Sequence, residues 1–188
     1  MADLRALYRK ASKNYNDAVH QIGTDQWHLP TPCTEWDVRA LMQHLVNEQL
    51  WVVPLLEGKT IAEVGNAFDG DNLGDDPIGA WDEASAGAIA AVDALTSLEQ
   101  VTHLSFGDFP AEEYLNQMLF DLHIHGWDLR SGIKVDSTLD GELTEYLMPW
   151  AEPAMKAYQA VGATAEPPPI ADDASPQTKI LALSGRRG

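Results

Sequence analysis

The segment Pro110–Gly132, PAEEYLNQMLFDLHIHGWDLRSG, decides how this chain of 188 residues is expected to fold. Its composition predicts a helix of about six turns at 3.6 residues per turn. We expect Asp108 to cap its N-terminus and Gly132 to end it. One stripe of the helix is apolar at the spacing of a core-facing surface, and it comprises Leu115, Met118, Leu122 and Leu129. The segment therefore predicts a central helix packed on a core.

Two polar residues accompany this stripe. His125 falls within it, and Asp121 lies one turn earlier at its edge. A carboxylate and an imidazole therefore project the same way, into or beside the core. A second apolar stripe faces elsewhere and comprises Phe120, Ile124 and Trp127. It is either a homodimer surface or a surface that the C-terminal helix covers.

Composition limits the classes of partner. The chain carries 12 Lys and Arg against 29 Asp and Glu, a net charge of −17, which disfavours nucleic acid and anionic membranes. Cys33 is the single cysteine, so an intrachain disulfide and a Cys-rich zinc module are excluded. The N-terminus has no apolar signal region, and no apolar run approaches 18 residues. We expect a cytoplasmic protein.

The rest of the chain also indicates helices. Apolar periodicity and breakers predict four of them, at residues 2–22, 35–56, 76–98 and 140–160. We expect Thr34 to cap the second helix, with Asp37 at N3. Residues 58–76 are predicted to be a surface loop, and residues 100–109 a connection with, at most, a short extended piece. Pro149 and Pro153 are expected to kink or break the last helix.

The domain prediction is a helical metal-binding bundle over residues 1–162 and a C-terminal tail over residues 163–188. The tail opens with a proline-rich stretch of polyproline type, EPPPIADDASP. The apolar run TKILALSG follows and is expected to dock back on the bundle. We see no repeats and no strand-rich region, so the fold class is all-α, four main helices with an extra helix and a tail.

A metal site is the chemistry that these helices favour. His44 lies at the margin of the second helix, and with Asp121 and His125 it could supply three ligands from two facing helices. Two imidazoles and one carboxylate suit zinc, ferrous iron or nickel, and three protein ligands leave positions open for catalysis. The alternatives are an Asp121–His125 ion pair or a core histidine bonded to backbone. Glu48 is a fourth ligand, a general base or a solvated edge residue.

Other polar residues receive lesser roles. Asp128 is expected to support His125 or to pair with Arg130, and His123 to pack on the loop side. Three histidines have no carboxylate or imidazole placed to converge with them, and we take them as surface or structural residues: His20, His28 and His103. Cys33 precedes a helix N-terminus, which favours a reactive thiol, but a packed cysteine is the commoner case.

The residues quoted so far resemble a known family. The stretches PTPCTEWDVRALMQHLV, DLHIHGWDLRSG and KILALSGRRG, with FGDFP before the central helix, resemble actinobacterial DinB-like metal-binding proteins. They are similar to the N-terminal domain of mycothiol-dependent maleylpyruvate isomerase. The resemblance implies an up-down-down-up four-helix bundle with a divalent metal held by His44, Asp121 and His125. The isomerase has Glu where this chain has Asp121, and it carries a further C-terminal domain.

Three functions remain open at this point. The first is a mycothiol-dependent transferase or isomerase, in which a metal holds the thiol sulfur, Glu48 handles protons and an electrophilic small molecule is the substrate. Zinc is the first choice of metal, with nickel or iron as alternatives. The second is a non-catalytic bundle that binds a metal, a small molecule or a protein partner. The third is a metal-dependent hydrolase with water as nucleophile.

Overall fold

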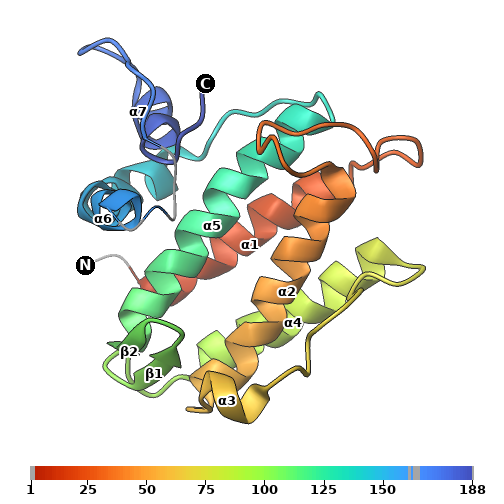
Figure 1. Ribbon diagram of the computed structural model, residues 1–188, viewed down its shortest axis with the longest axis vertical. Helices are drawn as coiled ribbons and strands as arrows, with labels where there is room; N and C mark the ends of the chain where they lie inside the picture. Colours follow the sequence, from red (N-terminus) through yellow and green to blue (C-terminus); the bar gives the residue numbers. More distant parts are fainter. Residues whose placement is uncertain (1–2, 161, 163–165, 188) are drawn as a thin grey trace.

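A computed structural model describes residues 3–160, 162 and 166–187 (Figure 1). Four long helices form a bundle: α1 (Leu4–Val19), α2 (Val38–Leu56), α4 (Pro77–Ala94) and α5 (Ala111–Gly132). Helices α1 and α5 pack against each other, as do α2 and α4. In Figure 1 the chain ascends in α1, descends in α2 and α4 and ascends again in α5. This is the predicted up-down-down-up arrangement.

Five smaller or outer elements complete the fold among the described residues. A short helix, α3 (Ile61–Val64), and an antiparallel hairpin of β1 (Val101–Leu104) and β2 (Gly107–Pro110) lie in the connections. Helix α6 (Gly141–Ala160) packs on α5 outside the bundle, and α7 (Pro176–Leu183) packs on α6. Because the two strands are so short, the all-α prediction is confirmed. Among the described residues, none of the helices combines the length and apolar character that a membrane crossing requires.

Helix α5 is buried on both of its apolar stripes. The predicted core stripe is buried throughout, at Leu115, Met118, Leu122 and Leu129. The second stripe is buried as well, because α6 covers it: the Phe120 ring lies 5.6 Å from that of Trp150. The alternative in which the C-terminal helix covers this stripe therefore describes the structure.

Several predicted helix ends are wrong. The structure begins α2 at Val38, where the carboxylate of Asp37 accepts from the Ala40 N–H at 2.8 Å. Thr34 is not the cap, because Asp37 pairs with Pro30 in an isolated antiparallel bridge, so the chain stays extended up to that point. Asp108 does not cap α5, because it lies in β2 and its carboxylate sits 2.7 Å from the His103 ring.

Other boundaries also differ from the predictions. Helix α1 ends at Val19 and α4 at Ala94, a few residues short of the predicted ends, and the predicted start at residue 2 lies outside the described residues. The predicted loop 58–76 contains α3, which a Thr60–Glu63 capping box begins. Helix α6 runs through Pro149 and Pro153, so the predicted break is absent there. The proposed boundary at residues 162 and 163 stays a prediction.

Candidate metal centre

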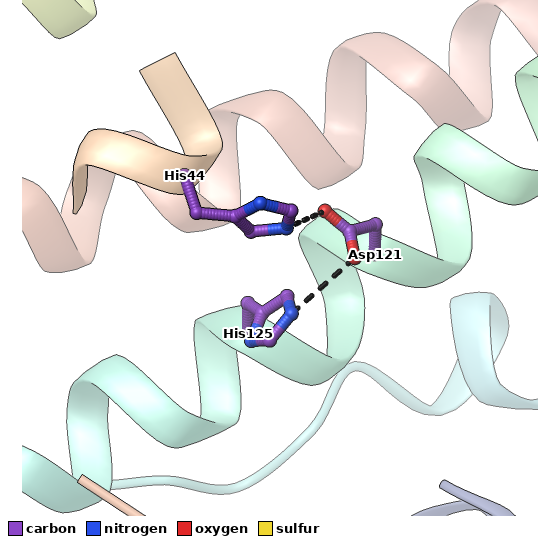
Figure 2. Close-up of side chains that lie close together, drawn as sticks. All are labelled: His44, Asp121 and His125. Atoms are coloured by element: carbon purple, nitrogen blue, oxygen red, sulfur yellow. Dashed lines mark hydrogen bonds and ion pairs between the residues drawn. The ribbon is translucent and has the colours of Figure 1, made fainter. Parts of the chain in front are cut away.

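Three side chains from two helices meet between α2 and α5. His44 comes from α2, and Asp121 and His125 come from α5, one turn apart (Figure 2). The Nε2 of His44 lies 3.2 Å from Oδ2 of Asp121, and the Nε2 of His125 lies 3.3 Å from Oδ1 of the same carboxylate. One donor atom from each residue lies within 4.8 Å of the other two. The structure thus brings together the residues predicted as ligands, whose role in binding a metal stays a prediction.

The same contacts describe the ion pair that the sequence left as an alternative. Burial alone raises the pKa of Asp121, but the neighbouring imidazoles of His125 and His44 outweigh it and lower that pKa well below its usual range. Burial lowers the pKa of His125, yet Asp121 and Asp128 reverse the effect and raise it to about 9. The cluster therefore attracts positive charge strongly, whether that charge is a proton or a metal ion.

Asp128 supports His125 from the side opposite Asp121. Its side chain is fully buried, and its Oδ2 lies 2.9 Å from Nδ1 of His125. The guanidinium of Arg186 donates to the same oxygen at 2.8 Å. Of the two roles expected for Asp128, support of His125 is therefore the one seen, whereas Arg130 donates to the backbone carbonyl of Asn14. Arg186 is not among the predicted site residues, because no spacing rule connects residues 58 positions apart.

Glu48 lies beside the cluster. Its Oε1 is 4.0 Å from Nδ1 of His44, one turn away on α2. Burial and the negative charge of Asp121 raise the pKa of Glu48 to about 7, against the opposing effect of His44 and His125. A carboxyl group with this pKa can accept or donate a proton near neutral pH. Its position suits a general base.

A cavity of about 410 Å³ opens beside these residues. The polar cluster of His44, Asp121, His125 and Glu48 lines one part of it. The remaining wall is largely apolar and aromatic, with side chains from α5 and α6 that include Met118, Phe120, Ile124, Trp150, Met155 and Tyr158. The Trp36 ring also lines the cavity and lies 4.6 Å from that of His44 and 5.6 Å from that of His125. A small molecule with an apolar body would fit this shape.

Cys33 lines the same cavity but is poorly suited to act as a nucleophile. Burial raises the pKa of its thiol, although the positive charge of Arg186 opposes the effect. The reactive form of a cysteine is the thiolate, which this environment disfavours. The packed interpretation of Cys33 therefore fits the structure better than the catalytic one.

The other histidines have partners that the sequence did not predict. His123 does not pack on the loop side: it is buried against α6, with Nε2 2.9 Å from the hydroxyl of Thr144. The three histidines taken to lack a carboxylate each have one, which the fold or a local turn brings near: Asp82 for His20, Asp37 for His28 and Asp108 for His103. These exposed or half-exposed pairs lie outside the cavity lining.

Comparison with known proteins places the chain in a family. The model of the mycothiol maleylpyruvate isomerase N-terminal domain matches residues 8–130, well over half of the chain. The chain belongs to this family. Two relatives are uncharacterized proteins of Mycobacterium tuberculosis, from strains CDC 1551 / Oshkosh and ATCC 25618 / H37Rv. Each is 26% identical over 140 residues, which cover 72% of this chain and 70% of the relative. No solved structure matches the chain.

The family match covers some residues of the candidate site and leaves others out. The region assigned to the mycothiol maleylpyruvate isomerase N-terminal domain contains His44, Asp121, His125 and Asp128. It ends at residue 130, so α6, α7 and Arg186 lie beyond it. The α6 part of the cavity's apolar wall and the arginine partner of Asp128 are thus contributed by the part of the chain that the match leaves out.

The donor set fits a divalent metal of the kind that this family resemblance implies. Bonds of about 2.0–2.2 Å to nitrogen and oxygen separate neighbouring ligands of a tetrahedral zinc site by roughly 3.3–3.6 Å. The imidazoles lie 3.2 and 3.3 Å from the two different oxygens of Asp121, and one donor atom from each of the three residues lies within 4.8 Å of the others, so a small movement of these side chains would bring them to one ion. Asp128 accepts a hydrogen bond from Nδ1–H of His125. This leaves Nε2 of His125 as the nitrogen that faces the cluster and could bind the metal.

Proposed function

We propose that His44, Asp121 and His125 hold a divalent metal ion, zinc before nickel or iron, and that the protein is a mycothiol-dependent transferase or isomerase of electrophilic small molecules. The observation that carries the proposal is the convergence of three donor atoms within 4.8 Å beside a cavity of about 410 Å³. Membership of the mycothiol maleylpyruvate isomerase N-terminal domain family supports the choice of thiol. We place this activity in the cytoplasm, where small thiols are kept reduced.

A bound metal would supply positive charge that keeps a thiol sulfur in its thiolate form at neutral pH. Side chains of the protein would orient the ligands, transfer protons and bind the substrate. Asp128 holds the His125 ring in place, and Glu48 accepts the proton that the thiol releases and returns a proton to the product. The aromatic and apolar side chains from α5 and α6 hold the body of the substrate and exclude water around the sulfur.

A metal-dependent hydrolase is the second candidate, and the position of Glu48 is the observation that favours it. Glu48 lies 4.0 Å from His44, so its carboxylate beside an open metal position can take a proton from water as well as from a thiol. The same ligands serve both reactions. The non-catalytic bundle is the third outcome, in which the cavity binds a ligand without turnover.

Metal analysis tests the site, and thiol consumption tests the reaction. Wild-type protein purified without chelators is compared with His125→Ala and with a control, His20→Ala. His20 is a suitable control because it is an exposed histidine at the C-terminal end of α1. We expect one metal per chain in the wild type and the control, and a large loss in His125→Ala. Equal metal content in all three would refute the metal site.

Each reaction has its own measurement. Metal-loaded protein is incubated with mycothiol and a panel of electrophiles, and the loss of free thiol is followed against His125→Ala. Thiol consumption that requires the metal ligands supports the transferase, whereas ester or amide hydrolysis without thiol supports the hydrolase. Metal binding without either reaction would leave the binding bundle and contradict the proposed enzyme.

A further inference from the structure

A fully buried carboxylate stands between the proposed metal centre and the end of the chain. Asp128 has no exposed side-chain surface, and its Oδ2 lies 2.9 Å from Nδ1 of His125. Arg186 reaches both of its oxygens, with Nη2 at 2.8 Å from Oδ2 and Nε at 3.4 Å from Oδ1. A planar guanidinium that contacts both oxygens fixes the plane of a carboxylate, which a single contact does not do.

The fold holds Arg186 firmly in this position. Its Nη1 donates to the carbonyl of Ser184 at 2.7 Å, and its backbone N–H donates to the carbonyl of Leu181 at 2.9 Å. Leu181 and Ile180 are fully buried where α7 packs on α6. The guanidinium is thus carried by a docked helix end and stays oriented toward Asp128.

We propose that Arg186 is a positioning residue of the metal centre, which holds the Asp128 carboxylate in the plane that accepts from Nδ1–H of His125 and so directs Nε2 of His125 toward Asp121 and His44. This inference rests on the proposed metal site. It extends that site beyond the family match, because the match ends at residue 130. The C-terminal segment is therefore a part of the centre and also covers the bundle.

The orientation of the His125 ring depends on what its Nδ1 contacts. An imidazole ring on a helix can rotate about its side-chain torsions, and a hydrogen bond at one nitrogen fixes the direction of the other. Asp128 sits three residues after His125 on the same helix, so it reaches Nδ1 only in a restricted set of conformations. Without Arg186, this buried carboxylate would lose the group that contacts both of its oxygens and fixes its plane.

The first measurement is metal affinity. Arg186→Gln is compared with Arg187→Gln, a matched control, because Arg187 is the adjacent arginine and is exposed. Competition with a chromophoric chelator for Zn²⁺ gives the dissociation constants. We expect Arg186→Gln to bind Zn²⁺ roughly 10- to 100-fold more weakly, the range usual for loss of a group that orients a ligand. Arg187→Gln is expected to match the wild type.

The second measurement needs no metal. In protein with 15N-labelled histidine, the Nδ1 proton of His125 should give a hydrogen-bonded, slowly exchanging signal, identified by its absence in His125→Ala. We expect it in the wild type and in Arg187→Gln, and its loss in Arg186→Gln. Arg186→Lys keeps the positive charge but cannot contact both oxygens of Asp128, so we expect it to show a weaker Nδ1 signal than the wild type. If Arg186→Gln is poorly folded, this weaker signal in Arg186→Lys tests the positioning role of Arg186 in its place.

The outcomes separate this inference from the proposed function. If Arg186→Gln keeps the wild-type affinity and the Nδ1 signal, the inference is overturned. A weakened affinity with an unchanged Nδ1 signal also overturns it, because Arg186 would then act by a route other than Asp128 and His125. If the wild type binds no Zn²⁺ but Arg186→Gln loses the signal, the proposed metal site fails while the positioning of His125 by Arg186 is supported.

Discussion

His123 offers a test of the interior of this fold through pH. Its side chain is buried between α5 and α6, where the Thr144 hydroxyl donates to the carbonyl of Asp140 at 2.9 Å. The hydroxyl proton is therefore engaged, so Nε2 of His123 acts as the donor across the 2.9 Å contact to Thr144. Burial lowers the pKa of His123 to about 4, with Asp140 opposing the effect and Arg130 adding to it.

The size of the effect follows from the two pKa values. An unfolded histidine has a pKa near 6.5, so between about pH 6.5 and pH 4 the unfolded chain binds a proton at residue 123 that the folded protein does not. Acid therefore favours unfolding in this window. The contribution of His123 to the free energy of unfolding falls by about 2 kcal/mol between pH 7.5 and pH 5. Below pH 4 the total fall is about 3 kcal/mol.

Urea unfolding at several pH values measures this contribution. The metal-free wild type is compared with His123→Gln, because glutamine can still donate to Thr144 but does not titrate. We expect the free energy of unfolding of the wild type to fall more steeply below pH 6.5, with the two curves separating by about 2 kcal/mol at pH 5. Parallel curves across this range would refute the argument that a neutral, buried His123 is required.

Three further changes test other contacts. Leu181→Ala should lower the free energy of unfolding in urea by about 2–5 kcal/mol, because it empties a fully buried position where α7 docks. Tyr8→Phe should cost about 1–3 kcal/mol in the same assay, since Gln49 Oε1 loses its buried donor at 2.6 Å, and adding Gln49→Leu should recover much of the loss. Glu48→Gln should retain the metal but slow any thiol-dependent turnover by roughly 10²- to 10⁴-fold, as followed by thiol consumption.

The long helices and the convergent ligands could be predicted because they depend on local spacing. The apolar stripe through Leu115 and Leu122 repeats at the period of a helix, and every residue of it is buried. Asp121 and His125 are four residues apart, which places them on one face whatever the surrounding fold. His44 was predicted to face them from its place at the margin of an apolar stripe, and the family resemblance implied the same set; spacing alone does not specify which helix faces which.

The parts that could not be predicted depend on contacts between distant segments. The hairpin over residues 101–110 is formed by strands of four residues, too short to show a clear alternation. It removes Asp108 from the cap position of α5. Arg186 meets Asp128 because α7 docks on α6; the sequence predicted that TKILALSG docks back but did not indicate which side chains would meet there. His123 was misplaced because the position of α6 along α5 was unknown.

Helix α5 separates two kinds of chemistry by rotation alone. His123 and His125 are two residues apart, so their side chains point about 200° apart around the helix axis. Toward α6, His123 meets a hydroxyl, and burial lowers its pKa to about 4. Toward α2, His125 lies between Asp121 and Asp128, which raise its pKa to about 9 against the same effect of burial. The neighbouring carboxylates are what distinguish His125, which attracts a proton or a metal ion, from His123, which stays neutral. Both side chains project from the same helix.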